Sequence, residues 1–473
     1  MQEHSARSVL SRLAAIVGDA HVLTVEADTA PYVAEPRGYY RGRAAAILRP
    51  GSAAEIAAIL RIANETLTPI VPQGGNTGLV GGQTPDESGR EIVLSLDRLD
   101  RIRAVDAAGG TMIAEAGAIL QQVQDAAREA GMLFPLSLGA EGSCRIGGNI
   151  STNAGGTSVL AYGNTRSLVM GLEVVLPTGE IWNGLRGLAK DNAGYDLKQL
   201  FIGAEGTLGI VTAAILKLYP QPRGQAVAFA ATTGPAEALR LFRMARDRAG
   251  ASLTAFELLP RIAIDMVVDN LPGARDPLAD RHPWYVLVEI SSGRSEADAA
   301  ELLSAALEEG MSAGIVADAA IAASLNHARA FWRIRHEVSG VQKFEGGSIK
   351  HDVSVAVEDV ADFIERASAA VVKIVPGGRP VPFGHVGDGN IHFNLTQPKG
   401  ADTAAFMARA PEVHEAVYEV ITSLGGSVAA EHGIGRYKRD LLATIKSDVE
   451  LDMMRRIKRA FDPNNILNPG RVL

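Results

Sequence analysis

Two histidines flank a short glycine-rich turn in the second half of the chain. Residues 383–394 read FGHVGDGNIHFN, in which Asp388-Gly389 is a favoured two-residue hairpin turn between apolar-alternating flanks. A turn centred there pairs His385 with His392, and directly opposed residues have Cβ atoms about 4.5–5.5 Å apart. Asn394 lies on the same face as His392, because side chains alternate with a period of two. The spacing predicts either one metal ion shared by both imidazoles or two structural imidazoles bound to backbone groups.

A cluster of cations precedes this hairpin, although the chain has a formal charge of −8. Its members within residues 331–351 are Arg333, Arg335, Lys343 and Lys350. Arg335 and Ser339 are four residues apart, one helical turn, so both can address one anion. Arginine binds a carboxylate through two parallel hydrogen bonds. Arg333 points off that face by the same spacing, and a solvated surface is the plainer interpretation of such a charge run.

Glycines are concentrated in the first half of the chain, with 25 of the 50 lying between Gly74 and Gly209. Residues 69–72 are typical of a short buried strand, and they lead into the loop QGGNTGLVGG at 73–82. Glycine lets backbone amides approach an anion closely, so this loop is suited to a phosphate group. The alternative is a β-domain with many turns. A Rossmann G-x-G-x-x-G loop and a Walker A Gly-Lys pair are both absent from the sequence.

Several motifs, in order along the chain, resemble those of one enzyme family. The segments PQGGNTG at 72–78, PLSLGAEGS at 135–143, IGGN at 146–149, TNAGG at 152–156 and GAEGTLGI at 203–210 resemble the FAD-binding domain of the vanillyl-alcohol-oxidase type. Together with GHVGDGNIH at 384–392, AEHGIG at 430–435 and NILNPG at 465–470, they resemble the FAD-dependent D-2-hydroxyacid dehydrogenases, which act on D-lactate, glycolate or D-2-hydroxyglutarate. The resemblance covers nearly the whole chain.

The resemblance implies that the first half of the chain binds FAD. The loop that starts at Pro72 would wrap the pyrophosphate, residues 135–152 would line the ribityl chain and the flavin, and residues 205–211 would contact the adenine side. Asn76 stands where relatives with covalent flavin often carry His, and Cys144 is typical of a small buried residue, so we expect noncovalent FAD. The residues expected to contact FAD are Pro72, Gln73, Gly74, Gly75, Asn76, Thr77, Gly78, Leu79, Pro135, Leu138, Gly139, Gly142, Ser143, Gly148, Asn149, Thr152, Glu205, Gly206, Ile210 and Asn468.

The resemblance also implies a catalytic centre in the second half. It makes Glu431 the third ligand of a divalent metal ion, beside His385 and His392. Two histidines and a carboxylate leave open positions, as a catalytic metal requires; Zn²⁺ fits these ligands, and Mn²⁺ or Fe²⁺ would fit as well. His432 would be the general base for the substrate hydroxyl while hydride leaves Cα for flavin N5. The alternative role for His432 is a third nitrogen ligand. The residues expected to bind the substrate are Arg335, Ser339, Lys350, Asn394 and His432.

The expected reaction is the FAD- and metal-dependent oxidation of a D-2-hydroxyacid to the 2-oxoacid. Two sets of carboxylate partners favour a dicarboxylate such as D-2-hydroxyglutarate or D-malate, because D-lactate or glycolate would leave charge unpaired. The alternatives are a flavin oxidase that uses O₂, a non-catalytic flavin carrier, and an enzyme of the alkyl-glycerone-phosphate synthase type. Cys144 is the one cysteine, so the chain cannot hold an iron–sulfur cluster by several thiolates. We therefore expect a separate electron acceptor, an electron-transfer flavoprotein or a quinone.

An α+β scaffold must position these groups. We expect a two-part FAD-binding domain at residues 1–221, a substrate domain with an antiparallel sheet at 222–430, and a C-terminal segment at 431–473 that returns to the flavin. Helices are predicted from residue 53 onward and at residues 118–130, 236–248, 297–309 and 448–461. Strands are predicted at residues 69–72, 92–96, 110–116, 284–290 and 349–357.

Composition excludes several other classes of protein. The 473 residues are 47% hydrophobic and 21% charged, which is typical of a globular protein of two or three domains. The lack of a basic stripe argues against a nucleic-acid partner, and no apolar run of about 18 residues is available to span a membrane. The N-terminus lacks the apolar core of a signal peptide and predicts a short amphipathic helix. We expect a cytoplasmic protein, at most peripheral to a membrane, and leave open whether it forms a homodimer.

Overall fold

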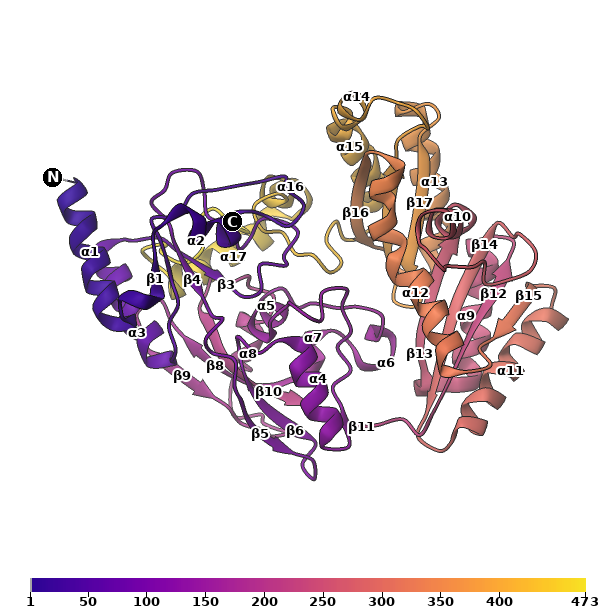
Figure 1. Ribbon diagram of the computed structural model, residues 1–473, viewed down its shortest axis with the longest axis horizontal. Coiled ribbons are helices and arrows are strands. Elements are labelled where there is room, and N and C mark those ends of the chain that lie inside the picture. Colours follow the sequence, from indigo (N-terminus) through magenta and orange to yellow (C-terminus); the bar gives the residue numbers. More distant parts are fainter. Residues whose placement is uncertain (1) are drawn as a thin grey trace. The chain divides into compact units, whose positions relative to one another are not determined.

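The computed structural model describes residues 2–473, with side chains from residue 9 onward, and the chain forms two compact units (Figure 1). The first unit comprises Met1–Gly155, Asn164–Pro220 and His432–Leu473, and the second comprises Gly156–Gly163 and Gln221–Glu431. The C-terminal segment therefore belongs to the same unit as the N-terminal half. The functional division at residues 1–221, 222–430 and 431–473 stays a prediction.

The first unit contains two sheets. Strands β2, β4 and β3 run parallel, and β1 joins β2 antiparallel, in the order β1-β2-β4-β3. The second sheet is antiparallel, in the order β5-β6-β10-β8-β9, and β11 pairs with β7. The strands are β1 (Val22–Leu23), β2 (Ala46–Leu48), β3 (Ile70–Gln73), β4 (Ile92–Ser95), β5 (Ile102–Asp106), β6 (Thr111–Glu115), β7 (Met132–Leu133), β8 (Val169–Val175), β9 (Ile181–Gly184), β10 (Ile210–Lys217) and β11 (Tyr219–Pro220). The helices are α1 (Gln2–Val17), α2 (Glu26–Val33), α3 (Ala53–Thr66), α4 (Leu120–Glu129), α5 (Ile146–Ser151), α7 (Thr165–Leu168), α8 (Lys198–Phe201), α16 (Arg439–Ile445) and α17 (Asp448–Phe461).

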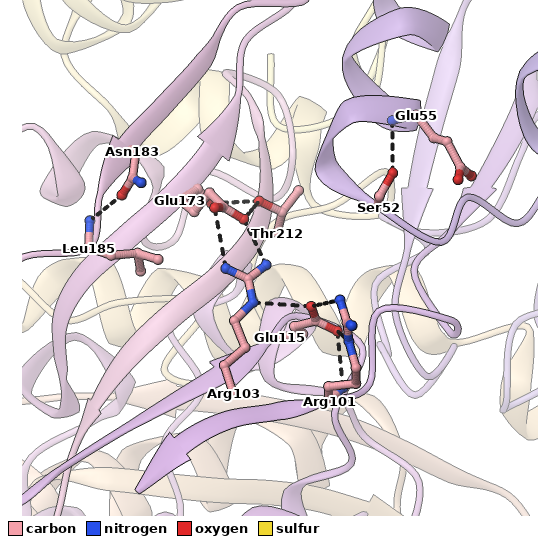
Figure 2. Close-up of polar contacts among 9 residues, drawn as sticks. All are labelled: Ser52, Glu55, Arg101, Arg103, Glu115, Glu173, Asn183, Leu185 and Thr212. Atoms are coloured by element: carbon pink, nitrogen blue, oxygen red, sulfur yellow. Dashed lines mark hydrogen bonds and ion pairs between the residues drawn. The ribbon is translucent and has the colours of Figure 1, made fainter. Parts of the chain in front are cut away.

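Helix α3 and strand β3 deliver the chain to the glycine-rich loop. Ser52 caps α3, since its Oγ accepts a hydrogen bond from the amide of Glu55 at 3.2 Å (Figure 2). The Glu55 carboxylate accepts from the amide of Gly51 at 2.8 Å. The helix ends at Leu67 in the left-handed region, with φ of 54°. The chain then enters β3, which runs directly into the loop that begins at Gly74.

Buried carboxylates on the five-stranded sheet are paired across its strands. Arg103 of β5 contacts Glu115 of β6 at 3.1 Å and Glu173 of β8 at 3.0 Å, as Figure 2 shows. Arg101 adds a second contact to Glu115 at 2.9 Å, and Thr212 of β10 donates to Glu173 at 2.9 Å. Pairing of this kind is what a buried carboxylate requires. The network therefore links β10 to its neighbours in the sheet, and β10 begins at Ile210, one of the residues predicted to contact FAD.

The C-terminal residues of the chain pack against the parallel sheet. Leu467 forms a parallel bridge with Ile70 of β3, and the amide of Asn468 donates to the carbonyl of Ile70 at 2.8 Å. Arg471 is 2% exposed and its guanidinium donates to the Glu91 carboxylate at 2.7 Å. This buried ion pair holds the C-terminal segment beside the glycine-rich loop, which follows β3.

The second unit is built on a seven-stranded antiparallel sheet in the order β15-β12-β14-β13-β17-β18-β16. Apolar side chains of α10 and α12 pack on this sheet, among them Ile264 and Val338 against Leu287 and Phe383. The strands are β12 (Gly224–Thr232), β13 (Leu253–Pro260), β14 (Trp284–Ser292), β15 (Val316–Ile321), β16 (Ser348–Ser354), β17 (Arg379–His385) and β18 (Asn390–Thr396). The helices are α6 (Val159–Tyr162), α9 (Pro235–Ala249), α10 (Arg261–Asn270), α11 (Glu296–Ser312), α12 (Leu325–Val341), α13 (Val360–Ile374), α14 (Thr403–Met407) and α15 (Ala410–Ser423).

The predicted helices and strands all form, with bounds shifted by a few residues. Helix α17 spans 448–461 as predicted, and β14 extends two residues beyond the predicted strand at 284–290. The predicted mixture of helix and sheet, with an antiparallel sheet in the second half, is confirmed. Across residues 2–473, the helices are all too short or too polar to cross a membrane.

Candidate active site

The predicted hairpin forms, but with a longer turn. His385 lies opposite Asn390 and Phe383 lies opposite His392, so the predicted pairing of His385 with His392 is wrong. The reason is that the turn takes four residues, 386–389, instead of two. The register shifts by an even number of residues, which keeps both histidines on one face. Their ring centroids lie 5.5 Å apart.

Glu431 completes a group of three possible metal ligands at this face. Its Oε1 lies 3.5 Å from His385 Nε2, and its Oε2 lies 3.9 Å from His392 Nε2. One ligand atom from each of the three residues lies within 4.8 Å of the others. The amide of Glu431 donates to Asp352 Oδ2 at 2.9 Å, which holds the backbone at this point. The structure therefore brings together the three residues predicted as metal ligands, all within the second unit.

Carboxylates outnumber cations around this group. Burial raises the pKa of Glu431 to about 7, and Asp352 and Asp388 add to the rise while His385 opposes it. Burial also raises the pKa of Asp388 to about 6. For His385 burial alone would lower the pKa, but Glu257 and Glu431 outweigh it and raise the pKa to about 9. A divalent cation would relieve this excess of negative charge, so the donor set fits a metal ion bound by nitrogen and oxygen.

Two buried acids behind the histidines were missed by the sequence-based prediction. Glu257 of β13 is 1% exposed, and its Oε1 contacts His385 Nδ1 at 2.6 Å. Asp352 of β16 is 2% exposed, and its Oδ1 lies 3.8 Å from His392 Nδ1. Burial alone would raise the pKa of Glu257, but Arg335 and His385 lower it to about 2. The available signal was a lone acid within an apolar strand, LTAFELLP, 128 residues before His385.

The cations predicted to bind the substrate lie on the same unit. Arg335 of α12 is 6% exposed, and its Nε donates to Glu257 Oε2 at 2.6 Å. Its Nη2 is buried and has no hydrogen-bond partner among the residues that the structure describes. Lys350 donates to Ser339 Oγ at 3.2 Å and to its carbonyl at 3.0 Å. Arg333 is exposed and donates to the carbonyl of Pro272 at 3.2 Å, so the two arginines point in different directions.

Gln342 is a further polar residue on this face that the sequence-based prediction missed. It follows Arg335 by seven residues and Ser339 by three, the spacing of one helix face. Its side chain is fully buried, and its Oε1 accepts a hydrogen bond from Asn394 Nδ2 at 3.0 Å. Asn394 lies opposite Lys350 in the sheet. The predicted substrate residues Ser339, Lys350 and Asn394 therefore form, with Gln342, two hydrogen-bonded pairs, Lys350 with Ser339 and Asn394 with Gln342.

His432 directly follows Glu431 and is the first residue of the C-terminal part of the first unit. It is half-buried. The segment after it is held by Glu205, whose carboxylate accepts hydrogen bonds from the amides of Ile434 and Gly435 at 2.8 Å each. A Cβ at Gly433 would lie 2.7 Å from Glu205 Oε1. Burial raises the pKa of Glu205 to about 6. The Glu205 side chain thus anchors the segment next to His432, a role that its motif alone did not predict.

The segments predicted to bind FAD contact one another within the first unit. A Cβ at Gly75 would lie 2.1 Å from the carbonyl of Ser143, which shows how closely these two loops approach. A Cβ at Gly206 would likewise lie 3.0 Å from Pro72 Cγ. Asn468 donates to the carbonyl of Glu205 at 2.8 Å and to that of Gly82 at 2.9 Å. Loops that lie far apart in the sequence therefore lie next to one another in this unit.

Two side chains of the glycine-rich loop region, Gln73 and Asn76, donate hydrogen bonds to backbone carbonyls of neighbouring segments. Asn76 has φ of 54°, and its side-chain Nδ2 donates to the carbonyls of Pro31 and Ala34 at 2.8 and 2.9 Å, so it shapes the loop. Gln73 donates to the carbonyls of Tyr32 and Gln83 at 2.8 and 2.9 Å. The other predicted contacts in these loops are Gly74, Thr77, Gly78, Leu79, Pro135, Leu138, Thr152 and, at the start of β10, the buried Ile210.

The loop surfaces fit a bound dinucleotide cofactor. A Cβ at Gly139, Gly142 or Gly148 would meet no atom within 4 Å, so open space lies beside these backbones. Cys144 beneath them is 3% exposed, and burial raises the pKa of its thiol to about 11. Asn149 Nδ2 lies 3.7 Å from Cys144 Sγ. A protonated, buried thiol agrees with a packing role for Cys144.

The architecture is that of flavoproteins with a two-part FAD-binding domain. The fold is similar to that of p-cresol methylhydroxylase, with a TM-score of 0.78 and 18% identity over 98% of this chain and 96% of that one. It is also similar to 4-ethylphenol oxidase from Gulosibacter chungangensis, with a TM-score of 0.73 and 19% identity over 98% and 96% of the two chains. The predicted fold of the vanillyl-alcohol-oxidase type is confirmed.

Sequence comparison gives the family. Residues 44–184 match the FAD binding domain family, and residues 221–472 match the C-terminal domain of FAD linked oxidases. A probable mitochondrial D-2-hydroxyglutarate dehydrogenase of Oryza sativa subsp. indica is 38% identical over 100% of this chain and 84% of its own. The D-2-hydroxyglutarate dehydrogenase of Xanthomonas citri pv. viticola is 39% identical over 90% and 89%, and the mitochondrial enzyme of Bos taurus is 39% identical over 92% and 77%. The chain belongs to the D-2-hydroxyglutarate dehydrogenases of the FAD-linked oxidase family, and the predicted resemblance is confirmed.

Proposed function

We propose that this FAD-dependent oxidoreductase oxidises D-2-hydroxyglutarate to 2-oxoglutarate with the help of a divalent metal ion. One observation carries the proposal. With a divalent ion held by His385, His392 and Glu431, the second unit has two positive groups suited to anions, that ion and Arg335, and both His385 and Arg335 contact the buried Glu257. A dicarboxylate can satisfy both groups, whereas a monocarboxylate leaves one of them without a partner. The names of the relatives, D-2-hydroxyglutarate dehydrogenases, support the same substrate.

Each side chain has a distinct part in the proposed reaction. When bound, FAD supplies the hydride acceptor and the metal ion, held by His385, His392 and Glu431, supplies positive charge beside the substrate hydroxyl. Arg335 binds the distal carboxylate through its free Nη2 edge. His432 accepts the hydroxyl proton on an imidazole nitrogen.

A polar group beside Arg335 completes the proposed site. Ser339, Lys350 and Asn394 orient the substrate chain between the two anion sites. Lys350 is held at Ser339 by hydrogen bonds of 3.0 and 3.2 Å, and Asn394 is held by Gln342 at 3.0 Å. Side chains fixed in this way lose little conformational freedom when they bind a ligand. We expect this group to favour a substrate with polar atoms at both ends.

The remaining properties extend this proposal. Zn²⁺ suits two imidazoles and a carboxylate, and Mn²⁺ or Fe²⁺ would suit them as well. FAD is bound noncovalently, since Asn76 is committed to loop contacts and Cys144 is a buried thiol. Electrons leave to a separate acceptor, an electron-transfer flavoprotein or a quinone. The cytoplasmic location and a homodimer also stay proposals; the rice and bovine relatives are named mitochondrial.

Anaerobic mixing of the flavin-loaded protein with candidate acids tests the proposal. Flavin absorbance is followed after addition of D-2-hydroxyglutarate, D-malate, D-lactate, L-lactate or glycolate, with and without prior treatment with a chelator. D-2-Hydroxyglutarate is expected to bleach the flavin fastest, and chelation is expected to abolish bleaching until Zn²⁺ is restored.

The outcomes separate the parts of the proposal. Failure of every D-2-hydroxyacid to bleach the flavin contradicts the reaction. Faster bleaching by D-lactate than by D-2-hydroxyglutarate contradicts the assignment of a dicarboxylate. Bleaching that is unchanged after verified metal removal contradicts the role of the metal. Rapid reoxidation by O₂ in air indicates an oxidase and contradicts the separate acceptor.

A further inference from the structure

Glu257 lies at the middle of β13, with contacts to two residues of the proposed site. Its Oε1 contacts His385 Nδ1 at 2.6 Å, and its Oε2 accepts from Arg335 Nε at 2.6 Å. The residue is 1% exposed, so these two partners take the place of water around the carboxylate. His385 is 128 residues away in the sequence and Arg335 is 78 residues away. One buried anion therefore joins a predicted metal ligand to the predicted substrate arginine.

The contact to His385 leaves the opposite ring nitrogen for a metal ion. With Nδ1 directed at Glu257, the nitrogen that faces Glu431 Oε1 is Nε2, at 3.5 Å. A histidine that donates Nδ1–H to a carboxylate carries its lone pair on Nε2, and such outer partners fix the orientation of metal-binding imidazoles. His392 has a looser arrangement, with Asp352 Oδ1 3.8 Å from its Nδ1. The contact between His385 Nδ1 and Glu257 Oε1, at 2.6 Å, is shorter.

The contact to Arg335 determines which edge of its guanidinium is available. Nε is bound to Glu257, and the guanidinium lies over the Phe383 ring, 5.1 Å from its centroid. Nη2 is buried, and within the described part of the chain it has no hydrogen-bond partner. A planar guanidinium held by its Nε directs its remaining donors along fixed lines. Glu257 therefore sets the direction in which Arg335 can bind a carboxylate.

We propose that Glu257 is a positioning residue that orients His385 for the metal and Arg335 for the substrate, so that the two binding events are coupled through one carboxylate. This inference rests on the proposed function, because it assumes a metal at His385 and a substrate carboxylate at Arg335. Coupling of this kind is reciprocal: a metal ion that shifts His385 and the Glu257 carboxylate changes the contact of Glu257 with Arg335, and a substrate bound to Arg335 changes the contact of Glu257 with His385.

Glu289 of β14 provides a matched control. It lies diagonally across from Glu257 on the same sheet face, since Ala255 pairs with Glu289 and Leu287 pairs with Glu257. Glu289 also contacts α12, because Trp332 Nε1 donates to its carboxylate at 2.8 Å. The hydrogen bonds of its carboxylate come from Thr254, Ser291 and Trp332, which are neither substrate residues nor metal ligands in the proposed site. Glu289 is half-buried, so Glu289→Gln changes a carboxyl group on the same sheet face without touching the proposed site.

The test measures metal binding and substrate kinetics separately. FAD-loaded protein is stripped with a chelator and titrated calorimetrically with Zn²⁺, for the wild type, Glu257→Gln and Glu289→Gln. Glu257→Gln is expected to raise the dissociation constant for Zn²⁺ by about 10- to 100-fold, the usual effect of losing an outer partner, and Glu289→Gln by less than about twofold. KM and kcat for D-2-hydroxyglutarate are then measured at saturating Zn²⁺, with and without Arg335→Ala. Arg335→Ala is expected to raise KM by a smaller factor in the Glu257→Gln background, because an unoriented arginine has less to lose.

Each outcome has one meaning. An unchanged Zn²⁺ dissociation constant in Glu257→Gln, or an equal effect of Arg335→Ala in both backgrounds, overturns the inference. A wild-type protein that binds no Zn²⁺, or whose flavin is not bleached, contradicts the proposed function instead. If Glu257→Gln fails to retain FAD, Glu257→Asp replaces it, since that variant keeps the charge but is too short to contact both partners. Wild-type values for both Zn²⁺ binding and KM in Glu257→Asp overturn the inference as well.

Discussion

Replacement of Glu205 by Gln should change how the stability of the protein depends on pH. The Glu205 carboxylate is buried and accepts hydrogen bonds from the amides of Ile434 and Gly435 at 2.8 Å each. Burial raises its pKa from 4.5 to about 6; these two amides and the nearby charge of Lys438 oppose the rise. Gln has nearly the same shape and does not titrate, so the comparison isolates the ionisation of this one group.

The sign and size follow from the raised pKa. A carboxyl group that holds its proton more tightly in the folded state stabilises the fold below its unfolded pKa of 4.5. That contribution is lost as pH rises through the folded pKa of about 6. The shift corresponds to about 2 kcal/mol at 1.36 kcal/mol per pH unit, and about two-thirds of it falls between pH 5 and pH 8. The wild type should therefore lose about 1.3 kcal/mol relative to Glu205→Gln over that interval.

Urea unfolding followed by flavin and tryptophan fluorescence measures this difference. Both proteins are unfolded at pH 5, 6, 7 and 8 and at one ionic strength, and the free energy of unfolding of the variant is subtracted from that of the wild type. Other titrating groups contribute equally to both proteins and cancel. A difference that stays constant across the four pH values, or that grows in favour of the wild type as pH rises, refutes the reasoning.

Three further predictions concern other residues. Arg335→Ala should raise KM for D-2-hydroxyglutarate about 10- to 100-fold, because it removes a charged hydrogen bond to the substrate. Arg333→Ala, on the exposed side of α12, should change KM less than about twofold, and equal effects of the two substitutions contradict the assignment of Arg335. Cys144 should resist a thiol reagent at pH 8 in the folded protein and react fully in urea, because burial raises its pKa to about 11; rapid reaction of the folded protein argues against this burial. Arg471→Met should lower the free energy of unfolding by about 3–5 kcal/mol, since it leaves Glu91 buried without its partner. Arg456→Met breaks an exposed pair with Asp452 and should lower the free energy of unfolding by less than about 1 kcal/mol.

The fold was accessible from the sequence because its signals are local. Helix α17 has a capping box at Ser447 and Glu450 and a break at Asp462, and it forms over the predicted residues. Helix periodicity and glycine-rich loops likewise depend on neighbours within a few positions. The hairpin that carries His385 and His392 shows the limit of such reasoning. Its turn is four residues long, yet an even shift in register kept both histidines on one face.

The missed residues are those whose roles depend on distant partners. Glu257 is the one acid in the apolar strand β13 and Asp352 lies in the more polar strand β16, and the importance of both comes from contacts to histidines far along the chain. Gln342 could have been found, since it continues the helical spacing of Arg335 and Ser339. Glu205 was assigned to FAD by its motif, while its carboxylate is used to hold the segment after His432. Local patterns therefore pointed to the side chains proposed to contact the substrate. They pointed to few of the buried residues that form hydrogen bonds or ion pairs with those side chains.

The peptide bond between Glu431 and His432 is where the chain leaves the second unit for the first. The residues proposed to recognise the acid all lie before this bond, apart from His432 itself. The loops proposed to hold the flavin, together with His432, lie in the other unit. Under the proposed function, most residues that recognise the acid thus belong to one unit and the flavin loops to the other. A descendant of this protein could acquire a new acid by changes confined to the second unit, with the inherited redox module unaltered.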